Sequence, residues 1–246
     1  MKVTVKAYLM KLIEEIIFAF SFLSRLPIKT DHFENSLNIL KNISSYFTLI
    51  GYIPGLIYSL TAVFQSEIAI RIAGLALGFY LFDLFHFDGL LDMLDGFLNQ
   101  STREKRLEIM SRGNVGPFAV FYGTLYVIAL YTTFSTLNPI DYMYASVLGR
   151  YAMTILIHIS KPAKKEGLAA SLFPQRRSSL FLALLFSTPL ILSPQRFTLS
   201  LSISILLAFI IKRISEIKIN GITGDVLGGT CLISQLTILL SLSILY

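Results

Sequence analysis

Long apolar runs alternate with short polar stretches along most of this chain. The uncharged segments cover residues 42–66, 113–140, 178–195, 197–211 and 226–246. At least three of them exceed the ~20 residues that a helix needs to cross a bilayer. The pattern predicts an all-α fold, a polytopic integral membrane helical bundle with about seven transmembrane helices. We expect these helices at residues 46–64, 68–85, 115–137, 140–159, 178–193, 197–211 and 226–246.

Residues 7–27 form another apolar stretch, which Glu14 and Glu15 interrupt. Because a charged side chain is costly inside a bilayer, we expect an N-terminal interfacial or re-entrant helix here. A full crossing stays open as an alternative if the two glutamates are paired. No small-residue cleavage pattern follows, so we do not interpret the segment as a signal peptide.

A single membrane domain is expected over residues 1–246. Residues 1–45 would be its N-terminal cytoplasmic or interfacial segment, and residues 46–246 its transmembrane bundle. No linker-like or repetitive segment divides the chain, and its length suits one compact domain. The lone Cys231 excludes an internal disulfide.

Small and cyclic residues mark the first predicted span, at Gly51, Pro54 and Gly55. They predict a break or kink in this helix. Two interpretations carry equal weight: close helix packing by small residues, or unwound backbone that lines a cavity.

Charge is scarce and unevenly distributed. Only 15% of the residues are charged, 54% are hydrophobic, and the net charge is +6. All but three of the 21 lysines and arginines fall in residues 1–45 or in three predicted long loops, 86–114, 160–177 and 212–225. This bias predicts that these segments face the cytoplasm from the plasma membrane. A nucleic-acid reader would not be this apolar, so no nucleic-acid partner is expected.

Four aspartates lie close together in an otherwise apolar stretch: Asp83, Asp88, Asp92 and Asp95. On a helix, the last three share one face at i, i+4 and i+7, where like charges repel. Individually, Asp88 could cap a helix and Asp95 could lie in a last turn before Gly96. For the set we favour a metal site, and hard carboxylate oxygens select Mg²⁺ or Mn²⁺.

Other polar residues have two interpretations each. Asp83 either pairs with the mid-span Arg150 or acts as a ligand, and His86 either bonds a helix terminus or supports catalysis. Asp225 lies in a glycine-rich turn that could let backbone N–H groups approach a phosphate. With the basic loops, these features indicate transfer between a pyrophosphate substrate and a hydroxyl acceptor.

A series of short segments, in this order, carries a family resemblance. They are Phe22-Leu-Ser-Arg25-Leu-Pro27, Leu49-Ile-Gly-Tyr-Ile-Pro-Gly55, His86-Phe-Asp88-Gly89-Leu-Leu-Asp92-Met-Leu-Asp95-Gly96, Arg106-Leu-Glu-Ile-Met110, Gly149-Arg150, Ala163-Lys-Lys-Glu-Gly167-Leu and Thr223-Gly224-Asp225-Val-Leu-Gly228. With them the chain resembles the cobalamin synthase family, the adenosylcobinamide-GDP ribazoletransferases. The family usually has an acidic and then a basic residue where Arg112 and Asn114 stand here, which indicates a divergent member.

The resemblance implies a Mg²⁺-dependent membrane transferase. A hydroxyl of α-ribazole, or of its 5′-phosphate, would attack adenosylcobinamide-GDP and release GMP, completing the nucleotide loop of adenosylcobalamin. It implies that Asp88, Asp92 and Asp95 hold metal, with Asp225 completing the site. His86 or one of the aspartates would take the hydroxyl proton. The residues assigned to substrate binding are Arg25, Asp83, Gly89, Gly96, Arg150 and Gly224.

Two rival functions remain at this level. A Mg²⁺-dependent CDP-alcohol phosphotransferase has similar chemistry, but its signature continues Asp-Gly-x-x-Ala-Arg where this chain has Asp92-Met93. A cation transporter would use the same intramembrane acids and leave the basic loops unexplained. The membrane lipid is an expected partner, and the oligomeric state stays open.

Overall fold

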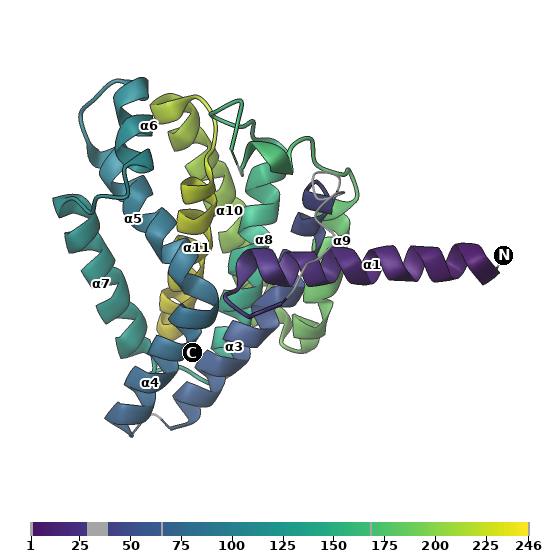
Figure 1. The fold of residues 1–246 in the computed structure, drawn as a ribbon. Coiled ribbons are helices and arrows are strands. Elements are labelled where there is room, and N and C mark those ends of the chain that lie inside the picture. The colour runs from purple at the N-terminus through teal and green to yellow at the C-terminus, as the bar shows by residue number, and fades with distance from the viewer. Residues whose placement is uncertain (1, 29–38, 65, 168, 246) are drawn as a thin grey trace.

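The structure is a computed structural model that describes all residues except 1, 29–38, 65, 168 and 246. The described residues form helices and loops with no β-strand among them, which confirms the all-α class. A bundle of helices running in broadly the same direction makes up most of the molecule. One helix, α1 (Lys2–Leu23), extends sideways from this bundle across the direction of the others (Figure 1).

The bundle contains the remaining helices in chain order. They are η2 (Ile43–Tyr46), α3 (Phe47–Val63), α4 (Ile68–Gly78), η3 (Phe79–Asp83), α5 (Leu84–Leu98), α6 (Arg103–Ser111), α7 (Pro117–Thr133), α8 (Asp141–Ile159), η4 (Ala170–Leu172), α9 (Ser179–Ser187), η5 (Thr188–Leu192), α10 (Pro194–Ile219) and α11 (Gly224–Leu245).

Helix α8 forms the centre of the bundle, and nearly all of its residues are buried. Helices α3, α10 and α11 pack around it. Glycine allows α8 to approach α11 closely, because a Cβ added at Gly149 would lie only 2.9 Å from the carbonyl oxygen of Cys231 on α11. A core helix buried on all sides must be apolar on all sides, as this one largely is.

The break predicted in the first span does not occur in α3. The helix runs unbroken from Phe47 to Val63 with Pro54 inside it. A Cβ at Gly51 would come within 2.7 Å of the Ser146 carbonyl oxygen, and one at Gly55 would contact Met143, both on α8. Close packing by small residues is therefore confirmed, and the unwound alternative is wrong.

The second predicted span, 68–85, is too short. Residues Ile68–Leu98 form one continuous helical segment in which a π-helical turn, η3, joins α4 to α5. The apolar residues between the aspartates, such as Leu90 and Met93, are buried against neighbouring helices and so extend the helix beyond the predicted span. Most of the predicted loop 86–114 is accordingly helical, as α5 and α6.

The span predicted at 197–211 is also longer in the structure. Helix α10 begins at Pro194, which suits a first helical position, and continues to Ile219. Lys212 and Glu216 form an i,i+4 ion pair in its last turns, so charged residues continue the helix past the uncharged run. Asn220 then ends it in a left-handed conformation, with φ of 57°.

Length and composition make four helical segments of the described residues candidates to cross a membrane. They are Ile43–Val63, Ile68–Leu98, Pro194–Ile219 and Gly224–Leu245. Pro117–Thr133 and Ser179–Leu192 are shorter apolar helices. These helices fit the predicted membrane protein, whereas the number of seven spans stays a prediction.

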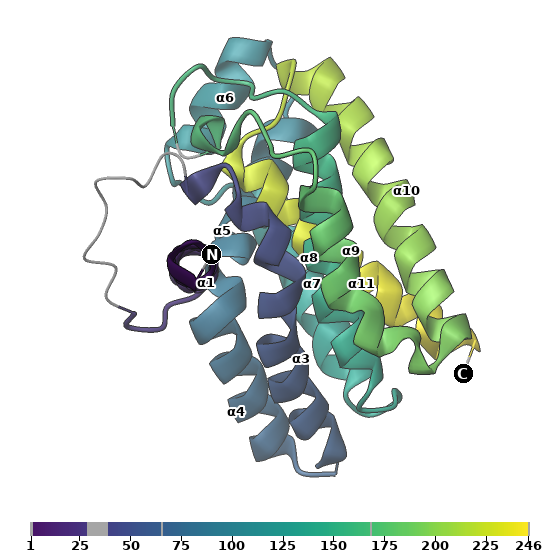
Figure 2. The same cartoon turned by 90° about the vertical axis from the view of Figure 1, so that its right-hand side faces the viewer.

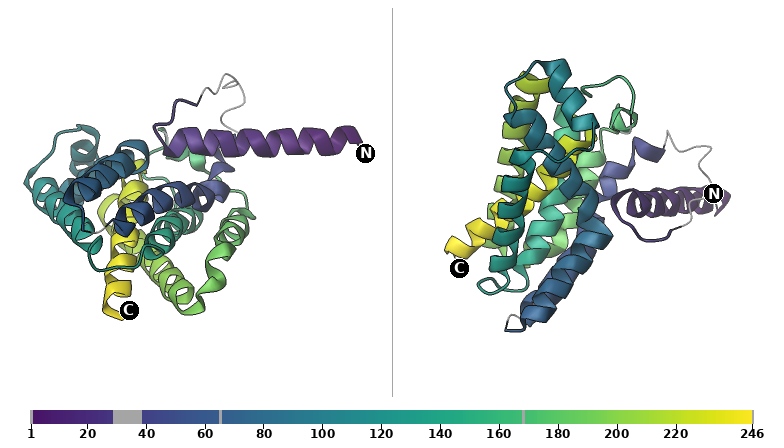
Figure 3. Two further views of the ribbon diagram at one scale, coloured as in Figure 1. Left: turned by 90° about the horizontal axis from the view of Figure 1, so that it is seen from below. Right: turned by 60° about the vertical axis from the view of Figure 1, so that its left-hand side comes forward.

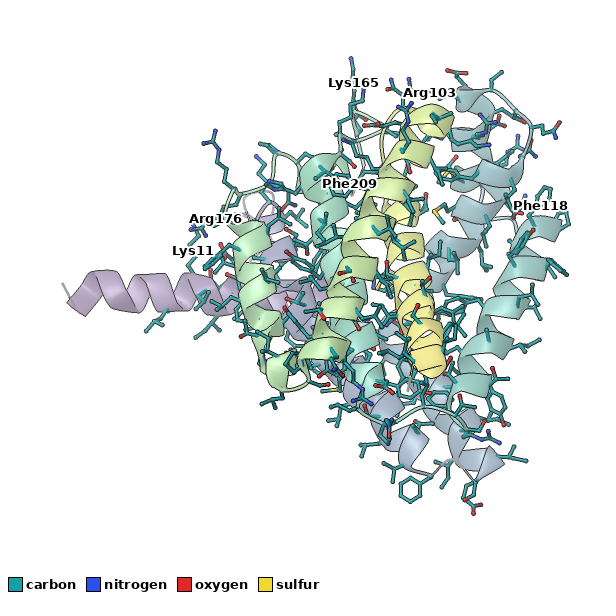
Figure 4. The ribbon with its side chains drawn as sticks, turned by 180° about the vertical axis from the view of Figure 1, so that it is seen from behind. Lys11, Arg103, Phe118, Lys165, Arg176 and Phe209 are labelled. Carbon is teal, nitrogen blue, oxygen red and sulfur yellow. The ribbon has the colours of Figure 1, made fainter. Side chains whose placement is uncertain are left out.

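The long connections gather at one end of the bundle, as predicted. Figure 2 shows α6, the loop before α9 and the α10–α11 turn together at the top. Two backbone hydrogen bonds join this loop to the turn: the Ala163 N–H donates to Ile222 O (2.9 Å), and the Ile222 N–H donates to Lys161 O (2.9 Å). The Arg103 guanidinium of α6 donates to the Ala163 carbonyl oxygen (3.0 Å), and Arg103 and Lys165 mark this end in Figure 4.

Helix α1 begins before the predicted residue 7 and ends at Leu23, earlier than the predicted 27. Leu26 precedes Pro27, which disfavours helical backbone there. Buried Glu15 joins α1 to the bundle by accepting hydrogen bonds from Asn42 Nδ2 (2.8 Å) and the Tyr46 hydroxyl (2.7 Å). The rest of α1 projects outward (Figure 3).

Candidate active site

The acidic helix α5 is held against the start of α11 by close backbone contact. A Cβ added at Gly89 would lie 2.9 Å from the Cα of Asp225, and one at Gly228 would lie 2.9 Å from the Cα of His86. Glycine at both positions lets the two helices approach until their backbones touch. This contact brings Asp225 beside the acidic face of α5, although well over a hundred residues separate them in the chain.

Three of the predicted metal ligands come together here. Asp92 is half-buried on α5 and lies within electrostatic reach of Asp88, Asp95 and Asp225. Asp225 in turn interacts with Asp88 and with Lys164, and its Oδ2 accepts a hydrogen bond from the Thr223 hydroxyl (3.0 Å). Asp88 is exposed. The structure thus brings Asp88, Asp92 and Asp225 to one end of the bundle.

Asp95 has a defined structural partner. Its carboxylate accepts the backbone N–H groups of Gly116 (2.6 Å) and Ala119 (3.0 Å) at the start of α7, and only 6% of the residue is exposed. It therefore caps α7 from a neighbouring helix, satisfying N–H groups that have no partner within α7 itself. The carboxylate has fewer free lone pairs than Asp88 or Asp92 for any metal ion.

The donor chemistry of this group fits Mg²⁺, because the side chains offer hard carboxylate oxygens and repel one another without a cation. In the conformation described, however, no three carboxylate, imidazole or thiol side chains among the described residues already surround a common point as metal ligands would. Asp88, Asp92 and Asp225 would have to turn toward one another on binding.

Asp83 and Arg150 form the ion pair that the sequence offered as one alternative. Arg150 Nη2 lies 2.8 Å from Asp83 Oδ1, and Asp83 Oδ2 accepts a hydrogen bond from the Tyr58 hydroxyl (2.7 Å). Arg150 is 0% exposed and Asp83 1%. The pair joins the π-helical segment η3 to the central helix α8, and both charges are enclosed within the bundle.

Arg25, a predicted phosphate contact, is exposed just after α1. Its guanidinium lies over two aromatic rings, 4.7 Å from the centroid of Tyr80 and 5.7 Å from that of Phe85. The Arg25 backbone N–H also donates to the Leu81 carbonyl oxygen (2.7 Å). These contacts hold the end of α1 against the η3–α5 region.

His86 lies on α5, one turn before the acidic face, and is only 5% exposed. Its Nε2 has no hydrogen-bond partner among the described residues. Together with Gly224 and Asp225, it lines a cavity of about 380 Å³. The alternative in which the ring bonds a helix terminus through Nε2 is therefore not seen.

A second cavity, of about 270 Å³, adjoins the first. Lys164, Glu166, Thr223 and Asp225 give it a polar lining. Gly224 borders both cavities, and a Cβ there would meet no atom within 4 Å, so this glycine faces open space. By contrast, Gly96 faces the Met110 side chain of α6, which makes it a packing residue.

The loop that departs from the family pattern lies next to this site. Exposed Arg112 pairs with Glu108 one turn earlier on α6, and Asn114 is exposed. Asp95 fixes the end of the loop through its bond to Gly116. The departure therefore changes an exposed stretch and leaves the capped start of α7 intact.

Sequence reasoning did not assign the cavity walls. Phe47, Met153 and Leu172 come from three separate elements and meet only through the fold. Each is an ordinary apolar residue in an apolar segment, so its type carried no functional signal. Lys164 was one of the basic loop residues and part of the Ala163–Gly167 segment of the family resemblance, but it had no role of its own. Its place beside Asp225 depends on the Ala163–Ile222 backbone contact.

The fold and the site define an all-helical protein with apolar helices of membrane-spanning length and clustered carboxylates beside two cavities. The family described as cobalamin-5-phosphate synthase matches residues 15–243, and the chain belongs to this family.

Curated relatives support the same assignment. The chain is 52% identical over 237 residues to an adenosylcobinamide-GDP ribazoletransferase of Fervidobacterium nodosum, covering 95% of this chain and 98% of that protein. Proteins with the same name from Thermosipho africanus and Kosmotoga olearia are each 47% identical, covering 95% and 92% of this chain and 100% and 97% of their own lengths. No solved structure matches the chain.

Proposed function

We propose that this chain is an adenosylcobinamide-GDP ribazoletransferase, which performs the last nucleotide-loop assembly step of cobalamin biosynthesis. A hydroxyl of α-ribazole, or of its 5′-phosphate, attacks the cobinamide-side phosphorus of adenosylcobinamide-GDP. A new P–O bond forms, the bond from that phosphorus to the bridging oxygen breaks, and GMP leaves. The product is adenosylcobalamin or its 5′-phosphate.

One observation carries this proposal. Relatives named for this activity match the chain over nearly its whole length. The packing of α5 against α11 supports it, because it gathers Asp88, Asp92 and Asp225 beside a polar cavity that includes Lys164 and Thr223. A diphosphate ester needs such a combination of metal-binding oxygens, a cation and hydrogen-bond donors.

Each polar residue of the site has a distinct role in this proposal. Asp88, Asp92 and Asp225 hold Mg²⁺, which supplies positive charge to the diphosphate and its leaving group when bound. Lys164 binds phosphate oxygens within the second cavity, Thr223 positions the Asp225 carboxylate through its hydroxyl, and Arg25 binds an anion beside Phe85. His86, or one of the aspartates, takes the proton of the attacking hydroxyl. Asp95 keeps the start of α7 in place beside them.

The proposed setting is the plasma membrane. Seven passes would be formed by α3, α4–α5, α7, α8, α9–η5, α10 and α11, with the long connections and the active site in the cytoplasm. Helix α1 would lie along the cytoplasmic surface of the bilayer. Exposed Leu9, Ile13 and Ile17, spaced four residues apart, give it an apolar stripe for that purpose.

The activity is tested with detergent-purified protein, Mg²⁺, adenosylcobinamide-GDP and α-ribazole, following GMP release. We expect turnover that EDTA abolishes and added Mg²⁺ restores. A parallel reaction with α-ribazole 5′-phosphate identifies the preferred acceptor. A CDP-alcohol substrate should give no product. Absence of GMP release under all of these conditions would contradict the proposal.

A further inference from the structure

The cavity of about 380 Å³ beside His86 lies where six elements meet. The ends of α1, α3, α5 and α11 contribute to it, together with α8 and η4. Its walls are mostly apolar and include several aromatic rings. The apolar wall residues are Phe22, Phe47, Phe85, Met153, Leu172 and Leu227.

His86 gives this apolar cavity a polar point. The imidazole is almost completely buried, and its Nε2 has no hydrogen-bond partner among the described residues. His86 and Asp225 lie among the lining residues, so the cavity has polar groups beside its apolar walls. The ligand should therefore combine a flat apolar part with a hydroxyl or ring nitrogen.

The cavity also borders the carboxylate site. It shares Ala169, Gly224 and Asp225 with the second, polar cavity. A molecule with its apolar part among the phenylalanines would thus present its polar end to His86 and Asp225. That polar end would lie beside the residues proposed to bind the diphosphate.

We propose that this cavity binds the aromatic base of the acceptor nucleoside, with its ribose directed toward His86 and Asp225. This assignment rests on the proposed function. The benzimidazole of α-ribazole is flat, apolar and small enough for a pocket at the lower end of the usual ligand range. The corrin ring of the other substrate is far larger than the cavity. Guanine would leave most of its hydrogen-bonding groups unpaired against these walls.

The chain contains no tryptophan, so one introduced tryptophan reports on its own surroundings. Phe22→Trp replaces one aromatic wall residue by another. We expect its emission to change saturably when α-ribazole is added to the purified protein without adenosylcobinamide-GDP. Guanosine, a nucleoside of comparable size with a polar base, should produce no saturable change.

Phe209→Trp provides the matched control. Phe209 is 53% exposed on the outer surface of α10 (Figure 4), away from the cavity lining. Its emission should not respond to α-ribazole. If Phe22→Trp fails to insert, Phe85→Trp places the reporter at the more exposed edge of the cavity.

A kinetic variant tests the same assignment independently. Met153→Trp should fill part of the cavity and raise the KM for α-ribazole by about tenfold or more, while the KM for adenosylcobinamide-GDP changes by less than about twofold. An equal rise in both KM values, or a rise only for adenosylcobinamide-GDP, would overturn the assignment.

The outcomes also separate this inference from the proposed reaction. A reporter that responds to guanosine and not to α-ribazole, or that stays silent in protein that still turns over, overturns the site assignment. Protein whose reporter responds to α-ribazole but that releases no GMP supports the site and contradicts the reaction.

Discussion

Asp92 and Asp95 occupy adjacent turns of α5, yet their carboxylates have different surroundings. Asp92 is half-buried among other carboxylates, whereas both oxygens of Asp95 accept N–H groups from α7. We expect Asp92→Asn to lower turnover by at least about 100-fold, because it removes one negative charge from the proposed Mg²⁺ site. The purified variant should keep the melting temperature of the wild type. GMP release and thermal melting in detergent measure the two effects.

Asp95→Asn is the matched comparison, since it makes the same chemical change one turn away. It keeps one acceptor oxygen for α7 and loses the other, so we expect a stability loss of about 1 kcal/mol and a lower melting temperature. Normal turnover in Asp92→Asn would remove the metal-site hypothesis. An unchanged melting temperature in Asp95→Asn would instead contradict the capping role.

The buried ion pair of Asp83 and Arg150 gives a second prediction at this scale. Asp83→Asn leaves the Arg150 guanidinium without a counter-charge in a fully enclosed position. Breaking such a pair costs about 3–5 kcal/mol, so the variant should melt well below the wild type. The double variant Asp83→Leu, Arg150→Met removes both charges and should recover much of the loss. Equal melting of single variant and wild type would exclude a stabilising role.

At the scale of elements, the contact of α5 with α11 controls the geometry of the site. Gly89→Ala would place a Cβ 2.9 Å from the Cα of Asp225. This is a backbone atom, which cannot rotate away as the end of a side chain could. The two helices must move apart, and Asp225 moves away from Asp92. We expect a large loss of turnover in protein that still inserts and purifies, measured as GMP release per folded molecule.

Gly123→Ala is a suitable control for this variant. Gly123 is also a buried glycine beside α5, but its new Cβ would meet the end of the Leu91 side chain, which can rotate. Turnover should stay near that of the wild type. Similar losses in both variants would mean that any tightening around α5 is harmful, and the specific role of the α5–α11 contact would be wrong.

The helices themselves were largely predictable, because apolar runs mark helices in this composition. Their ends were less so. The predicted span stops before His86, but α5 continues because apolar residues between the aspartates are buried against other helices. Likewise, Lys212 and Glu216 end the uncharged run of α10 without ending the helix. A charge marks the end of an apolar run, whereas capping and packing determine where the helix ends.

For the whole molecule, the sequence predicted which chemistry to expect and not how it is assembled. The spacing of Asp88, Asp92 and Asp95 placed them on one face, yet it could not show that Asp95 faces α7 while Asp225 joins the other two. The Asp83–Arg150 pair and the apolar cavity likewise depend on contacts between distant segments. Residue types identify candidate ligands, and tertiary packing selects among them.

The proposed orientation makes a prediction about the intact cell. Lys165 lies at the end of the bundle that carries the long connections, and Glu67 lies in the short α3–α4 connection, which Figure 2 places at the other end. Both are exposed, and Cys231, the native cysteine, is buried.

In a Cys231→Ser background, Lys165→Cys should resist a membrane-impermeant thiol reagent in intact cells and react after lysis. Glu67→Cys should react in both. All but three of the lysines and arginines lie in residues 1–45 and in the predicted loops 86–114, 160–177 and 212–225. Labelling of Lys165→Cys in intact cells would therefore invert the topology and move the active site to the outside.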